Sequence, residues 1–326
     1  MYQVALGIDI SKRCFDATLL WSSGKASHQA FSNTTEGFRK LKVWLARQKT
    51  GTVHACMEAT GRYGEVLARF LIEGGHWVSV VNPKRIKAYG DSKLRRNKSD
   101  KADALLIAEF CLKETPRLWE PLQGEVYELQ AMVRYLDALE KMRQQERNRL
   151  SAGLSSPTVR EQIEEHIAYL EARMIQLRDK VQAHINRDRG LKRQQDLLIS
   201  IPGIGELTAV KILAEIGDIR RFKSAKKLAA YAGLTPYQQD SGSSVRKRPR
   251  LSKLGNAHLR KALYLPAIVA KTHNPIVHAF CERLSSYGKC PMAIIGAAMH
   301  KLLRIAYGVL KSGRPFNADL APSSAS

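Results

Sequence analysis

Residues 4–21 read VALGIDISKRCFDATLLW, and this stretch decides the fold of the first part of the chain. An apolar run broken by one acid, Asp9, is followed by a short polar turn and a second apolar run. This pattern is typical of a β-hairpin. Residues 25–33 (KASHQAFSN) predict a third strand. The chain is therefore expected to begin with three meandering strands.

Helices and strands alternate after these three strands. Helices are indicated by apolar spacing and cap-type residues, strands by short buried-type runs, and Pro83 ends the last strand. The expected elements are a helix over 33–48, a strand over 53–59, a helix over 61–75, a strand over 76–83, a basic loop over 84–98 and a helix over 99–114. This order predicts an α/β class with a mixed sheet and helices on its faces.

Long helices follow, over roughly 125–150 and beyond the SSP at 155–157. In the second helix, apolar residues recur at alternating spacings of four and three, which is a coiled-coil seam. The seam consists of Ile163, Ile167, Leu170, Met174, Leu177 and Val181. It favours pairing between two chains as a dimer arm, and the alternative is a helical hairpin that packs on itself.

A second globular region begins with LISIPGIGELTAVKILAEIGDIRRF at 198–222. Two helices around a PGIG turn predict a helix-hairpin-helix, in which Gly203 and Gly205 let a phosphate approach the backbone. The alternative is an ordinary glycine-containing turn. A Gly/Ser loop with a basic run follows (QQDSGSSVRKRPRLSKLG, 238–255), then apolar helices to about 310 and a tail at 319–326 that is expected to be disordered.

The composition points to a polyanionic partner. Lys and Arg number 53 against 30 Asp and Glu, which gives a formal charge of +23 and a pI near 10.0. Nucleic acid is the expected partner, and a surface that is merely soluble and positive is the alternative. Five cysteines without a CxxC pair favour a reducing cytoplasm. Neither a signal peptide nor a membrane span of about 18 uncharged apolar residues is expected.

Four acids occupy unusual positions in the sequence: two lie within apolar strands and two directly follow a basic segment. Asp9 and Glu58 each interrupt an apolar strand, where an unpaired carboxylate is unfavourable. Asp100 and Asp103 lie three residues apart and share a helix face. They favour capping of that helix, with Ser99 as N-cap, or a metal. Together the four offer hard oxygen donors that suit Mg²⁺ or Mn²⁺ in two-metal phosphoryl chemistry.

Several motifs, in this order and separation, resemble the RuvC-like DEDD transposases of bacterial insertion sequences, which have the Piv DNA invertases as relatives. In the first half they are GIDISK (7–12), MEATG (57–61) and RNKSDKADA (96–104). In the second half they are SIPGIGELTA (200–209), AAYAGLTP (229–236), SGSSVR (241–246), SKLGNAHLRKALY (252–264) and AYGVLKSG (306–313). The resemblance covers nearly the whole chain.

This resemblance implies three parts. Residues 1–118 would form an RNase H-like (RuvC-like) catalytic domain, and residues 119–195 a helical, coiled-coil linker and dimerisation region. Residues 196–318 would form a mostly α-helical transposase domain that contains the helix-hairpin-helix and the serine loop. The resemblance carries over Asp9, Glu58, Asp100 and Asp103 as the metal-binding tetrad.

The resemblance also carries over Ser241, the first serine of SGSSVR, as a nucleophile, with Ser243 and Ser244 as close competitors. A covalent phosphoserine conserves the phosphodiester energy that hydrolysis would discard. The resulting hypothesis is a composite site in which one domain delivers Ser241 to the metals of another. The residues expected to contact nucleic acid are Lys84, Arg85, Arg95, Arg96, Lys98, Gly203, Gly205, Arg246, Lys247, Arg248, Arg250 and Lys253.

The function expected from the resemblance is site-specific DNA recombination in the bacterial cytoplasm. The implied partners are target and donor DNA, a structured noncoding bridge RNA that pairs with both, and further copies of the chain as a dimer or tetramer, with no membrane. Two alternatives stay open. One is a metal-dependent junction endonuclease that hydrolyses DNA without Ser241, and the other is a non-catalytic nucleic-acid-binding protein.

Overall fold

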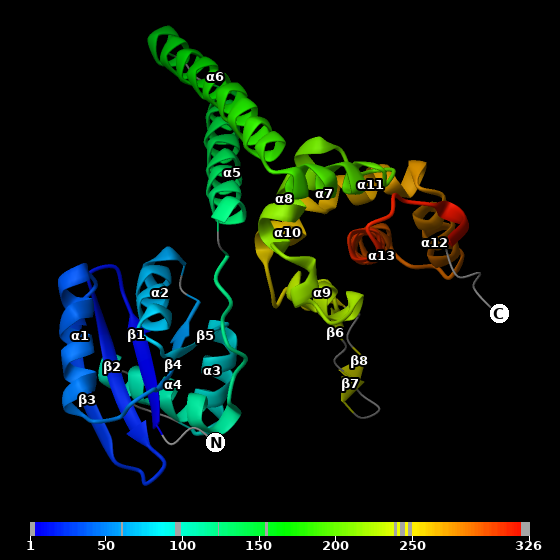
Figure 1. Ribbon diagram of the computed structural model, residues 1–326. Coiled ribbons are helices and arrows are strands. Elements are labelled where there is room, and N and C mark those ends of the chain that lie inside the picture. Colours follow the sequence, from blue (N-terminus) through cyan, green and yellow to red (C-terminus); the bar gives the residue numbers. More distant parts are fainter. Residues whose placement is uncertain are drawn as a thin grey trace. The chain divides into compact units, whose positions relative to one another are not determined.

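The chain forms two compact units, Met1–Pro121 and Leu122–Ser326, and each is described by itself. The computed structural model (Figure 1) describes residues 4–59, 61–94, 99–122, 124–153, 156–237, 240–241, 245–246 and 250–320. It describes the backbone alone for Arg62, Asp240, Ser241, Val245, Arg246 and Leu320.

The first unit is built on a five-stranded sheet with the strand order β3-β2-β1-β4-β5. Its strands are β1 (Val4–Ile10), β2 (Cys14–Trp21), β3 (Ala26–Ser32), β4 (His54–Glu58) and β5 (Trp77–Val81). β1, β2 and β3 are antiparallel neighbours, whereas β4 runs parallel to β1 and β5 parallel to β4. The predicted mixed sheet is confirmed, and the finer assignment to the RNase H-like fold stays a prediction.

Helices cover both faces of this sheet (Figure 1) because the side chains of a strand alternate between its two faces. Leu6 and Ile8 of β1 pack in one core with α1 (Thr35–Arg47) and α2 (Glu65–Glu73). Ala5 of β1 and Cys56 of β4 belong to a second core with α4 (Asp100–Glu114). The expected helices are therefore present, α2 being preceded by a 3₁₀ turn, η1 (Arg62–Gly64).

The basic segment after β5 begins as a helix, so the prediction of a loop over 84–98 is wrong for its first part. Helix α3 spans Pro83–Ser92, with Asn82 as its N-cap. Pro83, which was interpreted only as the end of a strand, also fits the first position of a helix because its backbone lacks the N–H that would be left unpaired there.

The second unit begins with two long helices that pack against each other, α5 (Gly124–Ser151) and α6 (Pro157–Arg187). Leu170 and Met174 of the predicted seam are buried against Leu136 and Leu139 of α5. Farther along the seam, Val181 joins the core that also holds the rest of the unit. The seam is thus occupied within one chain as a helical hairpin, which was the alternative reading. Pairing between chains stays a prediction.

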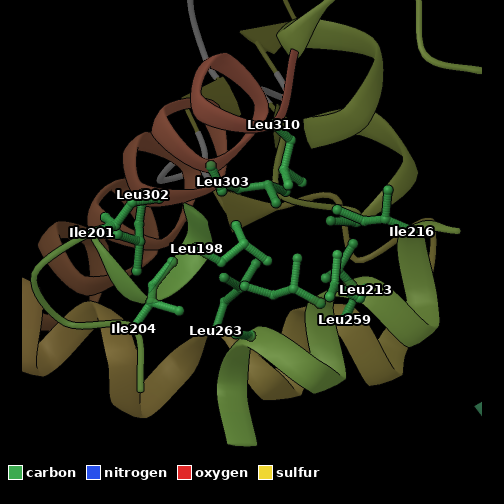
Figure 2. Close-up of a cluster of buried hydrophobic side chains, with 14 of the residues drawn as sticks. Leu198, Ile201, Ile204, Leu213, Ile216, Leu259, Leu263, Leu302, Leu303 and Leu310 are labelled. Carbon is green, nitrogen blue, oxygen red and sulfur yellow. The ribbon is translucent and has the colours of Figure 1, made fainter. Parts of the chain in front are cut away.

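The remaining helices enclose one large apolar core. They are α7 (Arg189–Ile199), α8 (Glu206–Ile216), α9 (Ala225–Tyr231), α10 (Ala257–Ala262), α11 (Tyr264–His273), α12 (Pro275–Ser286) and α13 (Pro291–Ser312), with 3₁₀ turns η2 (Ile219–Arg221) and η3 (Ala318–Leu320). Leu198, Leu213 and Leu302 are all buried in this core (Figure 2). The expected disordered tail includes residues 321–326, which lie outside the described residues.

Among the described helices, α13 alone is long and apolar enough by composition to cross a membrane. Half of the window that meets this test is buried in the protein, and Leu302 and Leu303 of α13 are fully buried in the core. Lys301 and Arg304 lie near the middle of the helix, where each charge in a bilayer would cost about 2.5–3.5 kcal/mol. α13 is therefore the central core helix of the second unit.

Candidate functional site

Asp9 and Glu58 end two neighbouring parallel strands of the sheet. Ile8 of β1 is paired with Met57 of β4, and the two acids directly follow this pair. Both side chains are half-buried. Because side chains alternate along a strand, they project on the face opposite to Ile8 and Met57, which is the face that α4 covers. The carboxyl ends of these two strands therefore bring two carboxylates together.

Helix α4 supplies the other two acids in its first turn. Ser99 is the N-cap, and its hydroxyl accepts a hydrogen bond from the backbone N–H of Ala102 at 3.2 Å. The predicted capping arrangement is therefore present, and it leaves both carboxylate groups of Asp100 and Asp103 available for another role. Capping and metal binding, first weighed as alternatives, are compatible in this geometry.

Gly7 fixes how closely α4 lies on the sheet. A Cβ atom at Gly7 would stand 2.1 Å from the carbonyl oxygen of Ala104 and 2.3 Å from the backbone nitrogen of Ala108. The helix backbone thus occupies the space of a side chain two residues before Asp9. This close approach sets the position of the first turn of α4, and with it Asp100 and Asp103, relative to the end of β1.

The four carboxylates interact electrostatically. Burial raises the pKa of Asp9, and the charges of Asp103 and Asp100 raise it further. Burial likewise raises the pKa of Glu58, with added repulsion from Asp9 and Asp103. None of the four forms an ion pair within the part of the chain that the structure describes. Such a concentration of negative charge favours a bound cation.

The donor set fits a hard divalent cation, because carboxylate oxygens are the ligands that Mg²⁺ and Mn²⁺ prefer. As the side chains lie, no group of three or more His, Cys, Asp or Glu residues is arranged to hold a metal ion anywhere in the described ranges. The backbone thus gathers the four acids at one end of β1, while their side chains are not closed around a common centre.

A fifth acid, Asp16, lies beside this site and was missed in the sequence. It is paired with Asp9 across β1 and β2, and its charge also raises the pKa of Asp9. Its carboxylate contacts Nε2 of His28 on β3 at 2.8 Å. A signal was available in the sequence: Asp16 lies in FDATLLW, a predicted strand that forms a hairpin with GIDIS, so the hairpin could have been expected to bring Asp16 close to Asp9.

The predicted phosphate-binding cations after β5 are only partly described. Lys84 and Arg85 occupy the first turn of α3 and are exposed. The Arg85 guanidinium lies 5.1 Å from the ring of Phe110, and Lys93, farther along, is paired with Glu109. Arg95, Arg96 and Lys98 lie outside the described residues.

In the second unit, the PGIG turn joins α7 to α8, and the finer assignment to a helix-hairpin-helix stays a prediction. Gly203 has φ +102°, and a Cβ there would stand 2.9 Å from the backbone N and Cα of Ala270 in α11. The absence of a side chain at Gly203 therefore allows close packing against α11. The sequence had suggested instead that it allows a phosphate to approach. Gly205 has open space at its Cβ position and caps α8 without a side-chain hydrogen bond.

Ser241 lies in a short β-hairpin inside the segment that was expected to be a loop. β7 (Asp240–Ser241) pairs with β8 (Val245–Arg246), with Ser241 opposite Val245. A second pair, β6 (Pro236–Tyr237) with β9 (Arg250–Leu251), involves residues that flank this hairpin in the sequence. Arg250 is exposed. The competitors Ser243 and Ser244 and the basic residues Lys247 and Arg248 lie outside the described residues.

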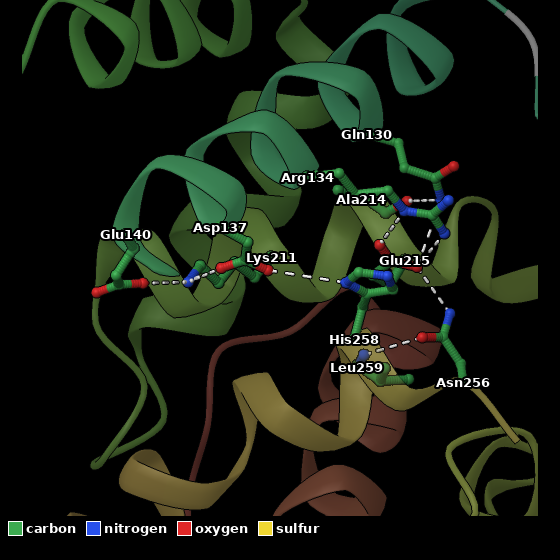
Figure 3. Close-up of polar contacts among 10 residues, drawn as sticks. All are labelled: Gln130, Arg134, Asp137, Glu140, Lys211, Ala214, Glu215, Asn256, His258 and Leu259. Atoms are coloured by element: carbon green, nitrogen blue, oxygen red, sulfur yellow. Dashed lines mark hydrogen bonds and ion pairs between the residues drawn. The ribbon is translucent and has the colours of Figure 1, made fainter. Parts of the chain in front are cut away.

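Buried polar contacts anchor the downstream end of this segment (Figure 3). Asn256 donates a hydrogen bond to Oε2 of Glu215 at 2.7 Å, and Lys253 just before it has φ +53°. Arg134 of α5 donates two hydrogen bonds to the same carboxylate, at 2.9 and 3.0 Å. Glu215 is 2% exposed. The helix that follows the serine hairpin is therefore fixed to both α5 and α8.

A second polar cluster ties α5, α8 and α10 together beside the first. Lys211 contacts the Asp137 carboxylate at 2.7 Å, and Nδ1 of His258 lies 3.8 Å from its other oxygen. Burial opposes ionisation of Asp137, but its interactions with His258 and with Lys211 outweigh burial and hold the pKa of this carboxyl well below its usual range. Neither cluster was predicted, because its members are distant in the sequence.

Two family models and several relatives match the chain. A model of DEDD transposases of the IS110 type matches residues 6–157, and a model described as "Transposase IS116/IS110/IS902 family" matches residues 195–282. The pilin gene-inverting proteins of Moraxella bovis and Moraxella lacunata are each 37% identical over 97% of this chain and 98% of their own length. The transposase for insertion sequence element IS1111A of Coxiella burnetii is 27% identical over 79% of this chain and 75% of its own.

Proposed function

The chain belongs to the IS110 family of DEDD transposases, and from this premise we propose that it recombines DNA through a covalent serine intermediate, guided by RNA. Membership makes it a DNA transposase, an enzyme that cuts and rejoins DNA. The proposal extends this to the residues, the metal and the guide.

We propose Asp9, Glu58, Asp100 and Asp103 as the ligands of Mg²⁺ or Mn²⁺. The observation that carries the proposal is the half-buried pair at the ends of β1 and β4, whose pKa values are raised by burial and by the acids of α4. A bound divalent cation would neutralise charge on the phosphate that reacts. In its absence the carboxylates repel one another, so the site gains stability when a cation enters.

We propose that Oγ of Ser241 attacks the phosphorus of a DNA phosphodiester. A phosphoserine ester forms, the bond to one strand end breaks, and that end departs as a hydroxyl after taking up a proton. The hydroxyl end of another strand then attacks the phosphoserine, which restores the serine and joins the new strand. The number of phosphodiester bonds is conserved, so no nucleotide cofactor is consumed. This requires Ser241 and the tetrad to act on the same phosphate.

We propose that a structured noncoding RNA selects the sites by pairing with target and donor DNA. The support is the family membership, and the net charge of +23 is compatible with an RNA partner in addition to DNA. If base pairing between the RNA and the DNA selects the sequence, the protein itself needs to recognise only the backbone and the shape of the nucleic acid. Leaving the RNA out of the reaction should then abolish recombination at the element's ends.

A trapping assay tests the chemistry. The protein is incubated with Mg²⁺, the noncoding RNA that flanks its element and DNA that carries the element's ends, and is then denatured. A covalent protein–DNA adduct is expected, and it should be lost in Ser241→Ala and in Asp9→Ala. Ser243→Ala and Ser244→Ala are the matched controls and should retain it. Cleaved DNA without an adduct would overturn the serine proposal in favour of a hydrolytic junction nuclease.

A further inference from the structure

A half-buried aromatic ring in the second unit is flanked by two cations. The Arg283 guanidinium of α12 and Nζ of Lys301 in α13 each lie 5.7 Å from the centre of the Phe280 ring. Arg283 lies three residues after Phe280, so both lie on the same face of α12. Lys301 reaches the ring from the neighbouring helix. Phe280 thus marks the point where the two helices bring their cations together.

A third cation belongs to the same cluster. Arg304 lies three residues after Lys301 on α13 and is exposed. Burial lowers the pKa of Lys301, and the charges of Arg304 and Arg283 lower it further. His300 is affected in the same way, by burial and then by Arg304 and Lys301. The cations are therefore close enough to repel one another.

Within the described residues, no carboxylate forms an ion pair with these three cations. Elsewhere in the second unit the cations of the interior face acids, as Arg134 faces Glu215 and Lys211 faces Asp137. Arg283, Lys301 and Arg304 form no ion pair in the ranges that the structure describes. Three uncompensated positive charges on one surface are stabilised when an anion with several charges binds.

An exposed aromatic side chain continues this surface. Tyr287 is 71% exposed and lies four residues after Arg283, where α12 ends. The order Phe280, Arg283, Tyr287 follows one stripe of the helix. Exposed aromatic rings beside unpaired cations suit a strand whose bases are unpaired, because bases stack on the ring while phosphates contact the cations.

We propose that Arg283, Lys301 and Arg304, gathered around Phe280, bind the phosphates of a single-stranded segment of nucleic acid, with one unpaired base stacked on Tyr287. This surface is formed by residues of α12 and α13 and shares no residue with the tetrad or the serine hairpin. The inference rests on the proposed function only in that the partner is a nucleic acid. RNA and DNA share the phosphodiester chemistry, and the test distinguishes them.

The test measures binding without chemistry. The full chain carrying Ser241→Ala is titrated, in the absence of divalent metal, into fluorescently labelled single-stranded RNA, single-stranded DNA and duplex DNA at several salt concentrations. Failure of the serine chemistry cannot alter this readout. The test variant changes Arg283, Lys301 and Arg304 to Gln. The control variant removes the same charge from exposed residues of α1, by changing Arg39, Lys40 and Lys42 to Gln.

The test variant is expected to bind one of the single strands at least tenfold more weakly than the control variant at about 0.15 M salt. Three lost phosphate contacts should also reduce the slope of log K against log salt by about 2, since each contributes about 0.7 on a single strand. Tyr287→Ala should weaken the single strand about tenfold and leave the duplex nearly unchanged. Whichever of RNA or DNA shows this loss is the ligand.

Folding is checked by thermal melting. The test variant loses the contacts of Arg283 and Lys301 with the Phe280 ring but also the like-charge repulsion, so its melting temperature should stay close to that of the parent. Equal binding by the test and control variants would overturn the proposal. So would an equal loss on duplex and single strands.

Discussion

Changing Gly7 to Ala should separate the two halves of the candidate metal site. The added Cβ would stand 2.1 Å from the carbonyl oxygen of Ala104 and 2.3 Å from the backbone nitrogen of Ala108. An ordinary contact begins at 3.4 Å, so the backbone of α4 must retreat by about 1.3 Å. The helix carries Asp100 and Asp103 in its first turn, and they would retreat with it.

Two effects of known size follow from this displacement. Overpacking of a close-packed interior costs about 1–3 kcal/mol, and the cost falls at the upper end here because the obstructing atoms are backbone. A misplacement of about 1 Å in a catalytic group reduces turnover on the order of 100-fold. Gly7→Ala should therefore lose activity even under conditions in which the protein remains folded.

The tryptophans provide a direct assay of the first unit. All four, Trp21, Trp44, Trp77 and Trp119, lie in Met1–Pro121. Tryptophan fluorescence during urea unfolding thus reports this unit alone. The matched control is Gly90→Ala in α3, where the Cβ would meet only the tip of the Leu106 side chain, at 3.0 Å. Strand exchange is measured in parallel, well below the unfolding midpoint.

The reasoning fails if Gly7→Ala unfolds at the same urea concentration as Gly90→Ala and retains full strand exchange. It also fails if a second change, Ala108→Gly, restores either property. The obstruction comes from backbone atoms of α4, so removing the Ala108 side chain leaves it in place.

Four further outcomes are expected. Because the pKa values of Asp9 and Glu58 lie above their ordinary 3.8 and 4.5, the folded metal-free protein holds protons that the unfolded chain releases, so the stability of the first unit should fall as pH rises through the raised values. The double variant Asp9→Asn, Glu58→Gln should be more stable than the parent at neutral pH and lose the stabilisation by millimolar Mg²⁺ seen in urea unfolding of the parent; a parent that Mg²⁺ does not stabilise would contradict this. Asp103→Asn should abolish strand exchange in the recombination assay while nucleic-acid affinity, by fluorescence anisotropy, stays within about twofold, since charge removal does not disturb the binding surfaces; undiminished recombination would refute the metal role. Glu215→Ala should cost about 1–3 kcal/mol in calorimetric unfolding of the second unit, because it removes the buried acceptor of hydrogen bonds from Arg134 and Asn256; a loss under about 0.5 kcal/mol would show that the network contributes little.

The sheet of the first unit was predictable because its signals are local. Alternation in residues 4–21, short apolar runs and capping residues each depend on a few neighbouring positions, and the mixed sheet they predicted is present. The helix α3 was missed because Pro83 ends a strand and starts a helix with the same backbone angle. The four acids were proposed as a metal site from their places in strands and from a family resemblance; that role stays a prediction, and the arrangement of their side chains could not be predicted.

Other features depend on pairs of residues far apart in the chain. The seam of α6 has the same spacing whether it meets a second chain or α5, and only the fold selects Leu136 and Leu139 as its partners. The lack of a side chain at Gly203 leaves room either for a bound phosphate or for a packed helix. In the structure, Ala270 of α11 occupies this space. Asp16 joined the site because strand pairing sets it opposite Asp9.

From the sequence we could therefore predict most elements of the first unit, the excess of positive charge, and four acids as candidate ligands of a metal. Periodicity, capping and net charge are properties of neighbouring residues or of the whole composition, so they can be read without a structure. Three other features could be known only from the tertiary structure: which acids pair with which cations, which glycine allows a helix to pack closely against it, and which cations form no ion pair among the described residues. Those depend on distances between segments that are remote in sequence, because side-chain electrostatics and packing act through space and not along the chain.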